Sequence, residues 1–261
     1  MFRRSSGDGE ISFVVEELRL AGYVGFWVIV LTGVVLTRAY AGIDFGDTVL
    51  TQVFGYNNIC VYFDFAPATY VLPFLWAIVL GLLLVYQAAQ WLQMRAELAQ
   101  GALSPGLYRV LTRLKLFESA MMMAFSTIFA VQPEAWNHTL LIHTLPFFML
   151  QIGLVSLAVS NTVHGIKSGY WASLALPAWF VPGAKLYIVS LVVIVAVKIP
   201  LAVNAMANSP WWDNASVGEL AHIVDVLFLI AAAIIPMWKA AYFIWGRRDR
   251  LKVVRLSPRT T

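Results

Sequence analysis

Residues 187–245 read YIVSLVVIVAVKIPLAVNAMANSPWWDNASVGELAHIVDVLFLIAAAIIPMWKAAYFIW. Two long apolar runs, about 184–206 and about 219–246, flank a short polar connection. Each run exceeds the ~20 residues that a helix needs to cross a hydrocarbon core of ~30 Å. Each also carries a charge, Lys198 in the first run and Asp225 in the second, at a depth where an unpaired charge is costly. The stretch therefore predicts a membrane hairpin whose two legs are joined by an ion pair.

The depths of the two charges agree with this pairing. If the first leg leaves the membrane near Met206, Lys198 lies roughly 12 Å inside that face, and Asp225 lies roughly 7–8 Å inside it on the second leg. A lysine side chain spans the difference. Two interpretations follow: a structural clasp, or a proton- or ion-coupled site in a small transporter or channel.

The composition indicates that the rest of the chain also lies largely within a membrane. Of its 261 residues 60% are hydrophobic and 12% are charged, against about 25% charged in an average soluble domain. We expect an all-α integral membrane protein whose first partner is the lipid bilayer. The net charge of +4 does not indicate nucleic-acid binding, because the basic residues are sorted to one side of the membrane. The single cysteine, Cys60, excludes an internal disulfide and a multi-cysteine metal site.

Apolar runs along the chain predict a bundle of about six transmembrane helices, within a domain spanning 20–246. They cover about 20–40, 69–94, 113–131, 138–162, 184–206 and 219–246. Before them, segment 1–19 is expected to form a short interfacial helix, because Ile11, Val14, Val15 and Leu18 recur at helical spacing. The loop 41–68 is expected to fold into a structured cap, and 247–261 to form a basic tail.

Basic residues set the expected orientation. Lys and Arg gather in both termini and in alternate short loops, whereas the opposite side holds only Arg38. Short loops rich in Lys and Arg remain on the cytoplasmic side. We therefore expect both termini on the cytoplasmic side, or on the matrix or stromal side of an organelle membrane.

Further ionisable residues fall inside the predicted helices. Glu118 and Lys239 lie at similar depths and complete a charged seam with Lys198 and Asp225. Lys115 precedes Glu118 by three residues on one helix face, so Glu118 is neutralised either locally or by Lys239.

Histidines provide the only metal-ligand candidates. His143 and His222 are predicted near one membrane face, where two imidazoles from different helices could ligate a b-type haem. His138 lies near them and His222 shares a helix face with Asp225, which would suit another metal ion. The alternative is ordinary interfacial hydrogen bonding.

Small residues mark a helix-packing face. Gly153, Ser156 and Ser160 lie at nearly helical spacing, which lets two backbones approach closely in lipid. The triplets beginning at Asn137 and Asn214 match the N-glycosylation pattern, on the side predicted to face away from the cytoplasm.

No nucleotide-binding loop, nucleophile elbow or zinc-protease motif occurs, so we lean away from an enzyme. The polar start and basic tail would be held in place by a partner chain. The first hypothesis is therefore a non-catalytic subunit of a membrane complex, contacting lipid and other subunits or further copies of itself. The alternatives are a small ion- or proton-coupled transporter or channel that uses Lys198 and Asp225, and a redox or metal-bearing membrane subunit that uses His143 and His222.

Overall fold

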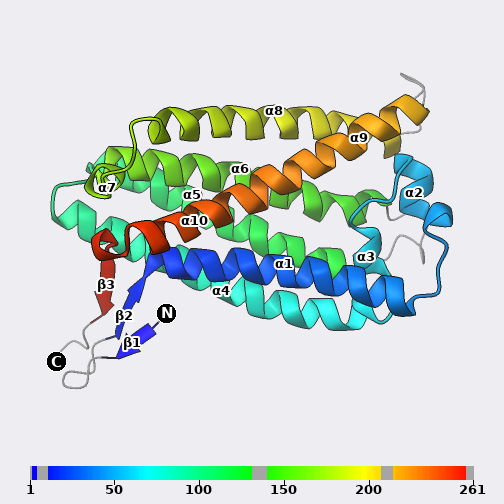
Figure 1. The fold of residues 1–261 in the computed structure, drawn as a ribbon, viewed down its shortest axis with the longest axis horizontal. Helices are drawn as coiled ribbons and strands as arrows, with labels where there is room; N and C mark the ends of the chain where they lie inside the picture. Colours follow the sequence, from blue (N-terminus) through cyan, green and yellow to red (C-terminus); the bar gives the residue numbers. More distant parts are fainter. Residues whose placement is uncertain (1, 5–10, 131–139, 207–213, 257–261) are drawn as a thin grey trace.

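The computed structural model describes the chain except residues 1, 5–10, 131–139, 207–213 and 257–261. Long helices lie side by side and form a lengthwise bundle (Figure 1). They are α1 (Val15–Tyr40), α4 (Ala68–Ala99), α5 (Pro105–Phe125), α6 (Leu140–Lys167), α8 (Phe180–Met206), α9 (Asn214–Leu229) and α10 (Ile235–Gly246). The π-helical turn Ile230–Ile234 joins α9 to α10 in one continuous rod.

Five helical segments are long and apolar enough to cross a membrane, so the chain is a multi-pass integral membrane protein. They are Val15–Tyr40, Ala68–Ala99, Ile142–Lys167, Phe180–Met206 and Gly218–Gly246. The expected count of six is not confirmed. The expected span 113–131 falls largely on α5, whose 21 residues include four charges, at Arg109, Arg113, Lys115 and Glu118. That charge density sets α5 apart from the five apolar spans.

A small antiparallel sheet joins the two ends of the chain. Its strands are β1 (Phe2–Arg4), β2 (Ile11–Val14) and β3 (Val253–Leu256), in the order β1-β2-β3. In the register of β2 and β3, Ile11 lies opposite Leu256 and Val14 opposite Val253. Both chain ends therefore lie at the same end of the bundle (Figure 1).

The expected interfacial helix before α1 is wrong at Ile11–Val14, because those residues form β2. A window of four apolar or small residues fits a strand as well as a helical turn. The distant strand β3 decides between them, and it lies about 240 residues along the chain. Phe13 then packs with Leu18 and Tyr86, and is 5% exposed.

The loop 41–68 folds into a structured cap at the opposite end of the bundle from the sheet (Figure 1). Short helices build the cap: the 3-10 turn Phe45–Asp47, α2 (Val49–Phe54) and α3 (Val61–Asp64). Leu50 and Val61 are almost fully buried in the cluster that joins the cap to α1 and α4. Position 55 ends α2 with a φ of 76°, which glycine adopts readily, and the chain turns there toward the bundle.

The sheet end of the bundle carries its own short elements. These are α7 (Tyr170–Ser173) and the 3-10 turn Arg248–Arg250, before β3. A further 3-10 turn, Ser126–Ala130, continues α5 at the cap end, where Phe129 packs against Phe63 of α3. In the last rod, the π-helical turn ends at Ile234, two residues before Pro236. A proline ring clashes with the carbonyl four residues earlier, and the wider turn gives that carbonyl room.

Candidate functional site: an ion pair between two cavities

The structure brings Lys198 of α8 and Asp225 of α9 together as an ion pair. Each residue is 7% exposed. The pair lies in the half of the bundle near the cap, where the two legs of the last hairpin pack against each other. Two neighbouring helices thus each supply one charge, and each charge compensates the other's loss of hydration.

The cap supplies further partners for the carboxylate. The Tyr56 hydroxyl and the Asn58 amide both donate to Asp225 Oδ2, the latter at 2.9 Å. The Asn58 side-chain oxygen accepts from the Cys60 backbone N–H at 2.9 Å, which fixes the orientation of the amide. Burial raises the pKa of the Tyr56 hydroxyl above its ordinary value of 10.0, so Tyr56 stays a donor well above neutral pH. No pattern in the sequence predicts these contacts, because they depend on how the loop folds back onto the helices.

Aromatic rings surround the ammonium. Lys198 Nζ lies 5.4 Å from the Phe147 ring centroid and 5.5 Å from that of Phe228. Both distances allow a cation–π interaction, which adds to the ion pair in a site shielded from water. Asp225 therefore holds several polar contacts, whereas Lys198 depends on Asp225 and two rings.

Two cavities border the ion pair, and Lys198 and Asp225 line both of them. One, of about 40 Å³, also contains Gln151 and His143 in its wall. Gln151 is fully buried, and neither atom of its amide has a hydrogen-bond partner among the described residues. The other cavity, of about 170 Å³, has His222 in its wall. Both volumes exceed the ~10–15 Å³ that one water molecule requires, and the polar walls supply partners for water.

The histidines expected to bind haem or metal lie in different surroundings. His143 Nε2 is 3.7 Å from Asp64 Oδ1 and lines the smaller cavity. His222 is exposed and stacks on Tyr56, with ring centroids 5.2 Å apart. Among the described residues no group of three or more His, Cys, Asp or Glu is arranged to hold a metal ion. His138 and Asn137 lie outside the described residues, and the haem hypothesis gains no support here.

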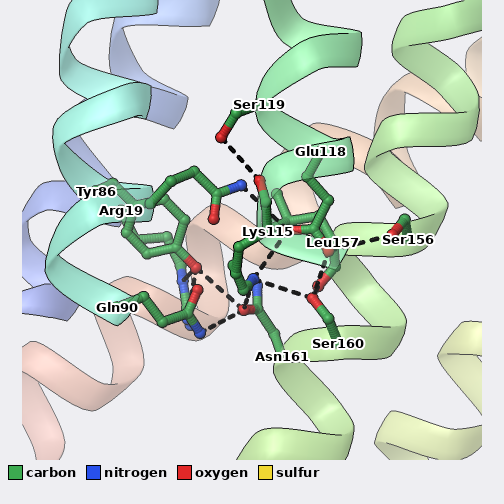
Figure 2. A network of polar contacts seen from close by, with 11 residues as sticks. Arg19, Tyr86, Gln90, Lys115, Glu118, Ser119, Ser156, Leu157, Ser160 and Asn161 are labelled. Atoms are coloured by element: carbon green, nitrogen blue, oxygen red, sulfur yellow. Dashed lines mark hydrogen bonds and ion pairs between the residues drawn. The ribbon is translucent and has the colours of Figure 1, made fainter. Parts of the chain in front are cut away.

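A second polar cluster lies nearer the sheet end and is centred on Glu118 of α5 (Figure 2). Lys115 Nζ lies 2.9 Å from Glu118 Oε2, so the neutralisation is local. Ser156 and Ser160 of α6 donate to Glu118 Oε1 at 3.1 and 2.6 Å. The packing residues Ser156 and Ser160 are thus also hydrogen-bond donors to a buried carboxylate.

Asn161 extends this cluster toward α1, as Figure 2 shows. Its side-chain oxygen accepts from Gln90 at 2.5 Å and from Lys115 at 3.1 Å. The Tyr86 hydroxyl, 3.2 Å from the same oxygen, accepts from Arg19 at 2.9 Å. α1, α4, α5 and α6 are joined by one hydrogen-bonded network in which Lys239 takes no part.

Close packing accompanies the network. A Cβ built on Gly153 of α6 would lie 2.8 Å from Met121 Cβ of α5, which is too close for an undisturbed contact. Glycine at this position therefore allows the near approach of α5 and α6 on which the Glu118 hydrogen bonds depend.

One ionic cluster was missed by the sequence analysis. Glu97, at the end of α4, lies 2.5 Å from His164 Nε2 and 2.6 Å from Lys252 Nζ. Gln93 also donates to it at 3.0 Å. Lys252 comes immediately before β3, so the cluster fastens the C-terminal strand to the bundle. Glu97 and His164 both lie near the ends of apolar runs, and this could have predicted their pairing. Because the second span was expected to end at 94, Glu97 was placed outside it.

Fold and site together define a multi-pass helical membrane protein with buried, paired charges. Comparison with known proteins adds no relative: no family model, no curated protein and no solved structure matches the chain.

Proposed function

We propose that this protein is a small ion- or proton-coupled membrane transporter in which Lys198 and Asp225 form the coupling pair. The observation that carries the proposal is the position of the pair between two cavities whose walls include polar side chains. A clasp with a purely structural role needs no surrounding space. Here the cavity of about 170 Å³ extends to the carboxylate.

The contacts of Asp225 supply a means of coupling. Protonation of this carboxylate would remove the charge that holds Lys198, and would weaken the bonds from Tyr56 and Asn58. Because those two residues belong to the cap, the charge state of Asp225 influences whether the cap stays closed over the cavities. One proton or cation thereby biases the equilibrium between two arrangements, which is what coupled transport requires.

The path of the chain supports six crossings in this proposal. β2 precedes α1 and β3 follows α10, and the two strands pair at one end of the bundle. A chain that begins and ends at one end must traverse the bundle an even number of times. The five apolar spans satisfy this condition only if α5 is a sixth. Within α5, Lys115 and Glu118 neutralise each other, and the α6 serines donate hydrogen bonds to Glu118. Both termini then share one side, and the distribution of Lys and Arg favours the cytoplasmic side.

The subunit hypothesis loses one of its reasons. Pairing of Val253–Leu256 with Ile11–Val14 holds part of the basic tail within the chain itself, without a partner. Membership of a complex remains a prediction, and co-purification of other chains with the native protein would test it.

Proteoliposomes that contain a pH-sensitive dye test the proposal. Under an imposed proton gradient or membrane potential, wild-type protein should carry an ion current above that of empty vesicles. Asp225→Asn should abolish this current, because the coupling charge is gone. The matched control is Glu219→Gln, which removes an exposed carboxylate near the start of the same helix and should leave the current unchanged.

Two results would contradict the proposal. The first is a wild-type protein, folded by circular dichroism, that moves neither protons nor Na⁺ or K⁺ under any imposed gradient. The second is an Asp225→Asn variant with full transport, which would leave the ion pair as a structural clasp.

A further inference from the structure

A third cavity, larger than the two beside the ion pair, lies near the sheet end of the bundle. It has a volume of about 300 Å³, and α1, α6, α8 and α10 form its walls. The polar and charged side chains in the wall include Arg19, Tyr23, Asn161, Thr162 and Lys239. A cavity of this size falls at the lower limit of small-molecule sites.

The charges around this cavity, which include the half-buried Lys239, do not balance. Arg19 Nη1 is 2.8 Å from Glu16 Oε2, and Lys115 is paired with Glu118. Lys239 is the third cation, and no carboxylate of the described residues lies within ion-pair distance of it. Lys239 Nζ lies over the Trp171 ring, 5.5 Å from its centroid. One positive charge is left over in the cavity wall, where an unpaired charge is costly.

The start of α8 also lines the cavity, through Phe180, Gly183 and Ala184. The Phe180 and Gly183 N–H groups donate to the carbonyls of Pro177 and Trp179, at 2.9 Å each, so they are not free to bind a ligand. The unpaired positive charge that faces the cavity is therefore that of Lys239, which suits a phosphate or carboxylate group.

The cavity opens toward the lipid. Trp179, immediately before α8, and Ile235 of α10 line it, yet they are 67% and 42% exposed, so the cavity reaches the outer surface of the bundle. Figure 1 shows α8 diverging from α10 toward this end, whereas α8 stays close to α9 at the cap end. A narrower apolar cavity of about 50 Å³ continues inward, with Tyr23, Leu154 and Ala232 in the walls of both.

From these observations we infer that the cavity between α1, α6, α8 and α10 binds the anionic headgroup of an amphiphile, with Lys239 as its counter-ion. The headgroup enters between α8 and α10, and the apolar chain stays at the lipid-facing mouth or extends into the inner cavity. The inference does not rest on the transport proposal, because Lys239 and the Lys198–Asp225 pair line different cavities.

Native mass spectrometry of the full chain tests the inference, with phosphatidylglycerol and phosphatidylcholine as matched anionic and zwitterionic probes. Wild-type protein should retain phosphatidylglycerol with about a tenfold preference or more, the factor expected for a hydrogen bond between charged groups. Lys239→Met keeps the length of the side chain and should remove the preference. Lys167→Met removes an exposed cation at the end of α6 and should keep it.

Gly183→Leu provides a second variant that leaves every charge in place. A Cβ at this position meets only Trp179, at 3.7 Å, so the backbone accepts a side chain that fills the cavity. It should also abolish the retention of phosphatidylglycerol. Equal retention of both lipids by wild-type protein would overturn the inference, as would a preference that survives both variants. Displacement of the lipid by inorganic phosphate alone would assign the site to a free anion and would overturn the inference that it binds an amphiphile.

Discussion

The ion pair between Lys198 and Asp225 makes the sharpest energetic prediction. Removal of one partner from a buried pair costs about 3–5 kcal/mol, because the other charge stays buried. Lys198→Met leaves a carboxylate that still accepts from Tyr56 and Asn58, so we expect the lower value, about 3 kcal/mol. Asp225→Leu leaves an ammonium with aromatic rings only, and leaves two donors without their acceptor. We expect the upper value, about 5 kcal/mol.

The double variant Lys198→Met/Asp225→Leu separates the energy of the ion pair from the cost of burying each charge alone. With both charges gone, the remaining loss is that of the two stranded donors, about 3 kcal/mol. Independent losses would instead add to about 8 kcal/mol. Reversible unfolding in mixed micelles with increasing sodium dodecyl sulfate, followed by circular dichroism, measures all three free energies. Additive losses, or a Lys198→Met variant less stable than Asp225→Leu, would refute this account of the pair.

Variants at Gly153 and Cys60, with Gly81 as a control, test packing and burial elsewhere. Gly153→Ala should lower the free energy of unfolding by about 1–3 kcal/mol, because its methyl group meets Met121. Gly81→Ala is the control and should have no such effect, because a Cβ there has nothing within 4 Å. Equal effects of the two variants in the same unfolding assay would contradict the close approach of α5 and α6. Burial raises the pKa of the Cys60 thiol from its ordinary value of 9.0 to about 12, so iodoacetamide should label the unfolded chain and spare the folded one. The unfolded chain loses this proton first, so the thiol should lower the free energy of unfolding as the pH rises from 9.0 to about 12, a loss that Cys60→Ala should remove.

The sequence was most informative where lipid restricts the choices. Lys198 and Asp225 could be paired because each interrupts an apolar run at a similar depth, and hydrocarbon offers a lone charge no other partner. The same reasoning separated the cap from the spans. It could not place Tyr56 and Asn58 on the carboxylate, because the approach of a loop to a helix leaves no periodic pattern in the sequence.

Contacts between distant segments account for the other differences. The strand at Ile11–Val14 depends on a partner near residue 255, and without it the spacing of Ile11, Val14 and Val15 indicates a helix. Lys239 could not be separated from Glu118, because depth along a helix does not report which face a side chain occupies. In the structure Lys239 faces the cavity beside α8, while Glu118 faces α6.

The pairing of β2 with β3 has a consequence for how the protein is made. A ribosome releases Ile11–Val14 long before it reaches Val253–Leu256, so the first strand has no mate during synthesis of all the intervening helices. The sheet, and the attachment of Lys252 to Glu97 next to it, close last. Truncation just before residue 252 would therefore leave a protein with every crossing inserted but without the β2–β3 pairing and the Lys252–Glu97 ion pair.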